Sequence, residues 1–364
     1  MEPEQTKPLF RQERTDKMKK EKLLHSTKIQ QMIAQYKHDM QLVDQLTADA
    51  EPHYEIEQEL YKKYEVKRGL RDLDGKGVRA GLTTISKVSA TQIVDGREVP
   101  AAGQLLYRGI PIEQLVQGFI THDRFGFEEI VYLLLMGHLP KADQLAQFKG
   151  LLTDYQELPN HFNSGVIMKM PSDNIMNTMA KCVLALHAYD PKPDDTSLPN
   201  VMRQCIQLVS QFPSLAVFGY QASMYFRNDR SMFIQKPDPK LSIAENILYM
   251  MRPDGKYTRL EAKLLDLCLV LHAEHGGGNN SAFTVHVVSS SGTDTYSTVA
   301  AALGSLKGPK HGGANIKVME MFEDLKQHCP DWEDEDALRE YLKGLLRGEG
   351  FDHSGLIYGI WFVK

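Results

Sequence analysis

Residues 258–282 read TRLEAKLLDLCLVLHAEHGGGNNSA, a capped apolar segment that runs straight into three glycines. Thr258 and Glu261 match the S/T-x-x-E capping box that opens helices. The apolar residues that follow recur at helical spacing as far as Leu271. The segment therefore predicts a helix that ends near Gly276, because a glycine just past a helix end can adopt the left-handed conformation that closes it.

Helical patterns dominate the chain from residue 113 onward. Ser242 and Glu245 form a second capping box. Further helices are expected over residues 127–136, 174–187 and 296–306, and again from Ala314. No strand–helix alternation appears, so a doubly wound sheet is excluded. We predict a mostly α fold built around a large buried helical bundle.

Two segments before residue 113 differ from this pattern. Residues 1–68 are rich in Lys, Glu and Gln and predict an N-terminal helical arm. Glycines then interrupt the chain repeatedly, and a short β ribbon is expected near residues 80–108. Its strands are expected over residues 82–86 and 104–108, around a turn at Asp95-Gly96.

Composition and charge exclude several classes of protein. Lys and Arg number 42 against 47 Asp and Glu, a net charge of −5, so no basic field for nucleic acid is expected. No run of 18 apolar residues exists, which excludes a membrane span. The four cysteines are too widely spaced for a redox pair or a zinc knuckle. With an N-terminus that has no apolar core and is rich in acidic residues, this predicts a cytoplasmic protein with reduced cysteines.

His272 and His275 lie three residues apart, so on a helix they would share a face. They fit three interpretations. The first is a pair of hydrogen-bonded core histidines. The second is a metal site, which would need a third ligand. The third is a pair of imidazoles that face a small polar molecule. The metal interpretation is the weakest, because Glu274 points elsewhere on a helix and the order does not match HExxH. We expect no metal.

A second histidine turn lies at residues 303–315, LGSLKGPKHGGAN. His311 follows a helix that ends at Gly308-Pro309 and precedes one that begins after Ala314, so it lies close to a helix N-terminus. The partial positive charge there favours neutral imidazole, which can donate to a carbonyl without first losing a proton. The alternative is a loop histidine without a role. A nucleotide site is excluded, because neither GxGxxG nor GxxxxGK[ST] occurs.

Together, the two turns resemble the citrate synthase family. Residues 272–279 resemble the family's H-x-D-H-x-x-x-N region, with Glu274 where aspartate is usual, and residues 308–315 resemble its G-P-x-H-G-x-A-N motif. Residues 105–115 are similar to its L-x-Y-R-G-x-x-I-x-x-L segment, and residues 127–135 to its F-E-E-V-x-Y-L-L-L helix. The resemblance extends over roughly residues 69–359.

The resemblance implies an all-α homodimer that condenses acetyl-CoA with oxaloacetate and water to citrate and CoA, a step of the tricarboxylic acid cycle. His275 would bind oxaloacetate with His272 nearby, and Asn279 would support that pocket. His311 would hydrogen-bond the thioester carbonyl as the enol forms. Acetyl-CoA is a substrate, and no cofactor is implied. The implied domains are an arm over 1–68, a large helical domain over 69–310 and an incomplete small helical domain over 311–364.

The resemblance stops near the C-terminus. The family continues with a G-x-G-H-x-V-Y segment, an arginine and a catalytic aspartate, whereas this chain reads GLIYG at residues 355–359 and then IWFVK. A C-terminally truncated member with impaired activity is therefore expected, since loss of a general base typically costs about 10²–10⁴-fold. The alternatives are a 2-methylcitrate synthase, which uses propionyl-CoA, and a non-catalytic subunit that only dimerises.

Overall fold

The computed structural model describes most of the chain beyond residue 81 and shorter stretches before it. These residues are 29–31, 33–35, 37–38, 40–41, 44–45, 47–48, 57–65, 82–309, 311–329, 331, 333–347 and 349. The chain divides into two units, residues 1–76 and 77–364. The predicted domain boundaries at 68/69 and 310/311 stay predictions. The predicted departure from the family at residues 355–364 lies outside the described residues.

The first unit contains helical segments only, as far as it is described. The described residues between 29 and 48 are helical and exposed. A short helix, α2 (Gln58–Lys63), follows them. Most of the predicted arm over residues 1–68 lies outside the described residues.

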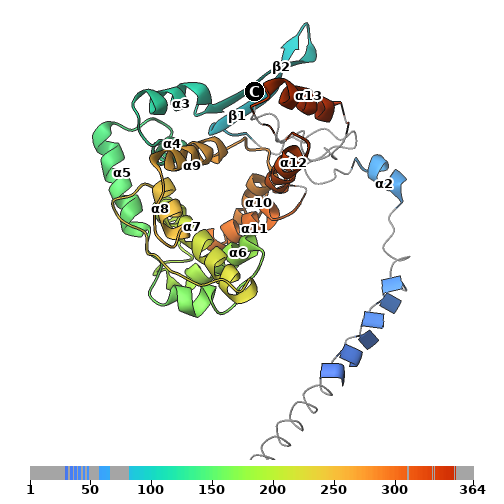
Figure 1. The fold of residues 1–364 in the computed structure, drawn as a ribbon, viewed down its shortest axis with the longest axis vertical. Coiled ribbons are helices and arrows are strands. Elements are labelled where there is room, and N and C mark those ends of the chain that lie inside the picture. The colour runs from blue at the N-terminus through green and yellow to red at the C-terminus, as the bar shows by residue number, and fades with distance from the viewer. Residues whose placement is uncertain are drawn as a thin grey trace, which may run out of the picture. The chain divides into compact units, whose positions relative to one another are not determined.

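The second unit is mostly helical (Figure 1). Its helices are α3 (Ile112–Thr121), α4 (Phe127–Met136), α5 (Ala142–Tyr155), α6 (Ile175–Leu186), α7 (Leu198–Arg227), α8 (Ile243–Met251), α9 (Arg259–His272), α10 (Asn280–Ser289), α11 (Thr295–Leu306), α12 (Ala314–His328) and α13 (Glu335–Leu346). A π-helical turn at Asn163–Ile167 and a 3₁₀ turn at His187–Tyr189 flank α6. Among the helices that the structure describes, none combines the length and the apolar character that a membrane span requires.

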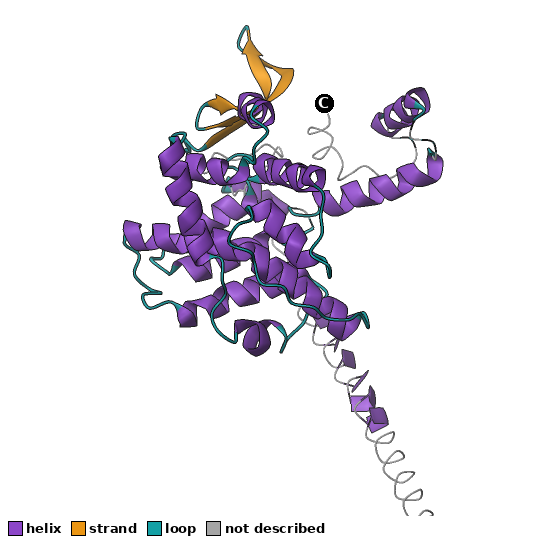
Figure 2. Ribbon diagram, turned by 60° about the vertical axis from the view of Figure 1, so that its left-hand side comes forward, coloured by secondary structure: helices purple, strands orange, loops and turns teal. Residues whose placement is uncertain are grey.

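Three antiparallel strands form the ribbon in the order β1 (Ser86–Val94), β2 (Arg97–Tyr107) and β3 (Ile110–Pro111). Figure 2 shows them in orange beside the helices. Asp95 and Gly96 both have positive φ, 52° and 76°, as a tight two-residue hairpin turn requires. The first β1 residue pairs with the last β2 residue, Ser86 with Tyr107, so the ribbon brings Tyr107 to the base of the hairpin.

The helices of the second unit share two large cores. The first lies among α6, α7, α8 and α11, and the second joins the ribbon to α3, α4 and α9. The second core contains Tyr107, Ile112, Leu115, Phe119, Ile130, Leu133 and Val270. The helices α12 and α13 pack on each other through a small cluster of their own around Met321 and Leu345. In the chain, His311 therefore lies between α11, which belongs to the first core, and the α12–α13 pair.

The predicted limits of α4, α6 and α11 and the predicted start of α12 are confirmed to within a residue, whereas α9 ends at His272 and not near Gly276. Both capping boxes form, with Ser242 opening α8 and Thr258 opening α9. Gly137 closes α4 with a φ of 87°. The strand prediction over residues 82–86 was wrong except at Ser86, because β1 runs on from Ser86 to Val94 through mixed polar and apolar residues without regular alternation. The turn at Asp95-Gly96 is confirmed.

A buried carboxylate joins α7 to α11. The side chain of Asp190 is fully buried, and Arg203 of α7 donates to it at 2.7 Å. The hydroxyl of Tyr296 on α11 donates to the same carboxylate at 2.6 Å. Burial alone would raise the pKa of Asp190, but hydrogen bonds from Arg203 and then Tyr296 outweigh it and lower the pKa to about 2.

This carboxylate is expected to make the fold sensitive to acid. Because its pKa is lowered from 3.8 to about 2 by folding, the unfolded chain takes up the proton first as pH falls. The stability that Asp190 contributes is thus complete above about pH 4 and is lost as pH falls towards about 2. Urea unfolding across this range should show a falling midpoint. In Asp190→Asn the urea midpoint should be lower at neutral pH and should decrease less steeply as the pH falls. An equal pH dependence of the midpoint in both proteins would contradict the assignment.

Candidate functional site

The first histidine turn begins where α9 ends. His272 is the last residue of α9, and the chain leaves the helix at Ala273. The expectation that His272 and His275 share a helix face was therefore wrong, since His275 follows the helix end. The imidazole of His272 turns back along α9 and donates from Nδ1 to the carbonyl of Cys268 at 2.7 Å. The imidazole of His275 is exposed.

Glu274 fixes the backbone of this turn. Its Oε1 accepts the backbone N–H of His275 at 2.9 Å and that of Gly276 at 2.7 Å. The backbone of Glu274 is held in turn by the hydroxyl of Tyr107, which lies 2.9 Å from its carbonyl oxygen and 3.2 Å from its nitrogen. Burial raises the pKa of Tyr107 to about 12, so this hydroxyl keeps its proton and can donate. The carboxylate beside His275 thus positions the turn.

The three glycines have different surroundings. Gly276 has a φ of 104°, and a Cβ there would lie 3.5 Å from Val88 of β1. A Cβ on Gly277 would lie 3.0 Å from the methyl group of Thr83. Around Gly278, by contrast, a Cβ would meet no described atom within 4 Å. The close approach that Gly276 and Gly277 allow is therefore to β1 and to the segment just before it.

The second turn is closed by its own backbone. A Cβ on Gly312 would lie 2.0 Å from the carbonyl oxygen of Leu306, and one on Gly313 would lie 2.3 Å from that of Pro309. The backbone nitrogens of His311 and Gly312 both donate to the carbonyl of Gly308, at 3.0 and 2.9 Å. Both glycines are therefore required for a turn this tight, which carries His311 between α11 and α12.

His311 is anchored by a serine that the sequence analysis missed. The Oγ of Ser281, on α10, lies 2.8 Å from Nε2 of His311 and 3.1 Å from the carbonyl oxygen of Ala302 on α11. Burial, and then the charge of the nearby His275 imidazole, lower the pKa of His311. The direction agrees with the neutral form that we predict, although the cause is burial and His275. The two imidazoles are thus close enough for their charges to interact.

The serine determines which ring nitrogen of His311 carries the proton. When the Ser281 hydroxyl donates to Nε2, the neutral ring carries its proton on Nδ1 and offers it to a ligand. When the hydroxyl donates to Ala302, Nε2 carries the proton and Nδ1 becomes an acceptor. The arrangement can therefore present either a donor or an acceptor, and the hydrogen-bond network rather than the net charge selects between them.

Asn279 begins α10. Its Oδ1 accepts the backbone N–H of Ala282 at 2.8 Å, and its Nδ2 donates to the carbonyl of Gly276 at 2.8 Å. The residue therefore links the first histidine turn to the helix that carries Ser281. No sequence signal marks Ser281 as a partner of a histidine 30 residues later, because the two meet only through the packing of α10 on α11.

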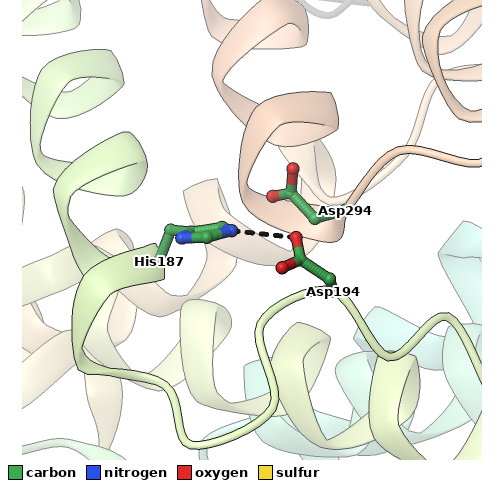
Figure 3. A group of neighbouring side chains, drawn as sticks. All are labelled: His187, Asp194 and Asp294. Carbon is green, nitrogen blue, oxygen red and sulfur yellow. Dashed lines mark hydrogen bonds and ion pairs between the residues drawn. The ribbon is translucent and has the colours of Figure 1, made fainter.

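A separate group of possible metal ligands is formed by His187, Asp194 and Asp294, whose ligand atoms all lie within 4.8 Å of one another. Figure 3 shows the imidazole of His187 directed at Asp194, with Asp294 beside them. His187 Nε2 lies 3.0 Å from Asp194, and Asp294 caps α11 by accepting the N–H of Ser297 at 2.8 Å. Because Asp194 is 79% exposed, we assign the group a structural part in holding its loop to α11.

A cavity of about 290 Å³ lies elsewhere in the second unit. It is lined by residues of α4, α5, α7 and α8 and of the loop that precedes α8. None of His272, His275 and His311 lines this cavity, so the candidate site consists of the two histidine turns themselves.

Comparison with known proteins agrees with these motifs. A family model described as citrate synthase, C-terminal domain, matches residues 70–360. The chain belongs to the citrate synthase family. The predicted family membership and the citrate-synthase-like, mostly helical fold are confirmed.

Similar members of the citrate synthase family come from bacteria and archaea. The citrate synthase of Acidithiobacillus ferridurans is 37% identical over 248 residues, which is 65% of this chain and 59% of that protein. The 2-methylcitrate synthase 1 of Corynebacterium glutamicum is 32% identical and covers 74% of this chain and 65% of its own length. The crystal structure of citrate synthase from Pyrobaculum aerophilum superimposes with a TM-score of 0.57 at 28% identity, covering 73% of this chain and 63% of that one. The chain thus spans less than two thirds of these relatives.

Proposed function

We propose that this chain takes part in citrate synthase-type condensation of acetyl-CoA with oxaloacetate and water, giving citrate and CoA. The observation that carries the proposal is the imidazole of His311, which Ser281 anchors at 2.8 Å and whose pKa is lowered by burial and by the nearby His275. The family membership of residues 70–360 supports the reaction type. Acetyl-CoA is a substrate, and no cofactor is proposed.

The two turns have separate roles in this reaction. His275, with His272 nearby, binds oxaloacetate, and Asn279 supports that pocket through the carbonyl of Gly276. His311 donates from Nδ1 to the thioester carbonyl oxygen while a base removes a methyl proton of acetyl-CoA. The enol carbon then attacks the keto carbon of oxaloacetate, and water hydrolyses the thioester. A donor already placed where negative charge develops stabilises the transition state.

In this mechanism Ser281 selects the useful tautomer of His311. Replacing Ser281 with alanine is expected to lower kcat about fivefold, because the lost hydrogen bond contributes roughly 1 kcal/mol to the Nδ1–H form. Steady-state release of CoA measures the effect. Thr284→Ala is the matched control, since Thr284 lies one turn later on α10 and bonds only its own helix at 2.8 Å. An equal loss in both variants would contradict the role of Ser281.

The proposed reaction is tested by assaying the purified chain with acetyl-CoA and with propionyl-CoA in the presence of oxaloacetate. Faster release of CoA from acetyl-CoA supports the citrate reaction. Faster release from propionyl-CoA would support the 2-methylcitrate reaction of the Corynebacterium relative. No turnover, together with a dimer by light scattering, would identify a non-catalytic dimerising subunit. The full-length Acidithiobacillus enzyme is the reference for the reduced turnover predicted from residues 355–364.

A homodimer is part of the proposal. Leu184 on α6 and Val287 on α10 are large apolar residues that are 52% and 53% exposed, and both helices pack against α11. All ten residues of α10 are described, and none of them is buried within one chain. A second copy covering these helices would bury them. Light scattering at about twice the mass of one chain is expected.

We also propose a cytoplasmic location. The four cysteines are unpaired, and Cys182 and Cys329 are buried as small apolar side chains. Free buried thiols are typical of proteins that fold in a reducing compartment. Neither nucleic acid nor a membrane is among the proposed partners.

A further inference from the structure

The hydroxyl of Tyr107 contacts the helix end from which the first histidine turn departs. Tyr107 is the last residue of β2 and is completely buried. Its oxygen lies 2.9 Å from the carbonyl oxygen of Val270 and 3.4 Å from that of Leu271, both in the last turn of α9. It also lies 2.9 Å from the carbonyl oxygen of Glu274, just beyond the helix.

This hydroxyl stands in for a helix C-cap. The last carbonyls of a helix have no partner within it and are often satisfied by a left-handed glycine. Here α9 ends on Ala273 in right-handed conformation, and Gly276 comes too late to close the helix. The backbone N–H of Ala273 donates to the carbonyl of Val270 at 3.4 Å, and Tyr107 supplies a second donor to this helix end from another element. The direction in which the chain leaves α9 is therefore set by the end of β2.

The same contact extends to His275 through Glu274. The Tyr107 hydroxyl accepts the N–H of Glu274 and shares its one proton among the carbonyls of Glu274, Val270 and Leu271. The carboxylate of Glu274 in turn holds the N–H groups of His275 and Gly276. The glycines then rest on the other strand of the ribbon, with Val88 3.5 Å from the Cβ position of Gly276. Both sides of the turn thus lie against the ribbon, and the imidazole of His275 remains exposed.

We propose that Tyr107 is a positioning residue for His275, through which the β1–β2 ribbon sets the affinity of the site for the keto-dicarboxylate oxaloacetate. The inference rests on the proposed function, in which His275 binds that substrate. Tyr107 touches no substrate itself. Its hydroxyl acts through the backbone of Glu274, and its ring belongs to the core below the ribbon.

The test compares two conservative variants, Tyr107→Phe and Tyr296→Phe. Both tyrosines are almost fully buried, and each hydroxyl makes short hydrogen bonds, but that of Tyr296 binds Asp190 between α7 and α11. Calorimetric titration with oxaloacetate should give a Kd raised five- to twentyfold in Tyr107→Phe and within twofold of the parent in Tyr296→Phe. The KM for acetyl-CoA and kcat should change less than twofold in Tyr107→Phe. Unchanged oxaloacetate affinity in a folded Tyr107→Phe overturns the proposal.

A double-mutant cycle with Glu274→Ala tests the path of the effect. If Tyr107 acts through Glu274, the Kd of the double variant for oxaloacetate should lie within twofold of the Kd of the weaker-binding single variant. Fully multiplicative losses would show that the two residues act separately and would overturn the path.

Hydrogen exchange keeps this inference distinct from the proposed function. The amides of His275 and Gly276 should exchange at least tenfold faster in Tyr107→Phe than in the parent without any ligand, and should be unchanged in Tyr296→Phe. A parent chain that binds no oxaloacetate overturns the proposed function, and with it the substrate named here. Exchange that is unchanged in Tyr107→Phe overturns the positioning role itself, whether or not oxaloacetate binds.

Discussion

Replacing His311 with alanine is expected to lower kcat/KM for acetyl-CoA by about 10²–10³-fold, the typical cost of removing one preorganised donor from a developing oxyanion. The variant removes the only group that we assign to the thioester carbonyl. It should leave the affinity for oxaloacetate within a few-fold of the parent, because His275 belongs to the other turn. Release of CoA and calorimetric titration with oxaloacetate measure the two effects separately.

The exposed residue His122, at the end of α3, provides the control for this variant. His122→Ala should retain full activity. His311→Gln, which keeps an N–H donor near the same position, should retain more activity than His311→Ala. If His311→Ala is folded and keeps more than a tenth of the parental kcat/KM, His311 does not polarise the carbonyl.

Replacing Arg203 with alanine is expected to lower the free energy of unfolding by about 3 kcal/mol, near the lower end of the cost of breaking a buried ion pair. Asp190 would then keep a buried charge without its cation, although Tyr296 and Gln204 still donate to it at 2.6 and 3.1 Å. Urea unfolding should show this as a large fall in midpoint with an unchanged slope.

Arg227→Ala is the matched control. Arg227 lies on α7, as Arg203 does, and it pairs with Asp173. That pair is 3.3 Å long with both side chains more than half exposed, so its loss should cost less than about 1 kcal/mol. Equal effects of the two variants would show that the burial of Asp190 does not make its ion pair important. Adding Asp190→Asn to Arg203→Ala should restore part of the loss by removing the unpaired charge.

Local signals in the sequence predict much of the helical architecture. Capping boxes, terminal glycines and apolar spacing identify α4, α6 and α11 to within a residue and locate the starts of α8 and α9. The sequence analysis does not delimit α7, because this 30-residue helix contains Pro213 and buries several polar side chains such as Gln204, Ser214 and Gln221. Their burial depends on partners from other elements, so the helix shows no clear apolar period.

The histidines of the candidate site could be predicted from the sequence, but the residues that position them could not. Gly-rich turns mark His275 and His311, whose imidazoles lie close enough for their charges to interact. Ser281 and Tyr107 carry no local pattern, because their hydroxyls meet partners 30 and 167 residues away. The relation of His272 to His275 was mispredicted, since a helical period was extended past the point where Tyr107 ends the helix.

The three consecutive glycines 276–278 differ in how many other residues each position can accept, because they lie at different distances from the ribbon. A selection for activity from a library randomised at residues 276–278 should recover only glycine at 276, where φ is 104° and β1 lies against the backbone. At 277 it should accept at most the smallest side chains, since the methyl group of Thr83 lies 3.0 Å away. At 278, which faces open space, it should accept most residues.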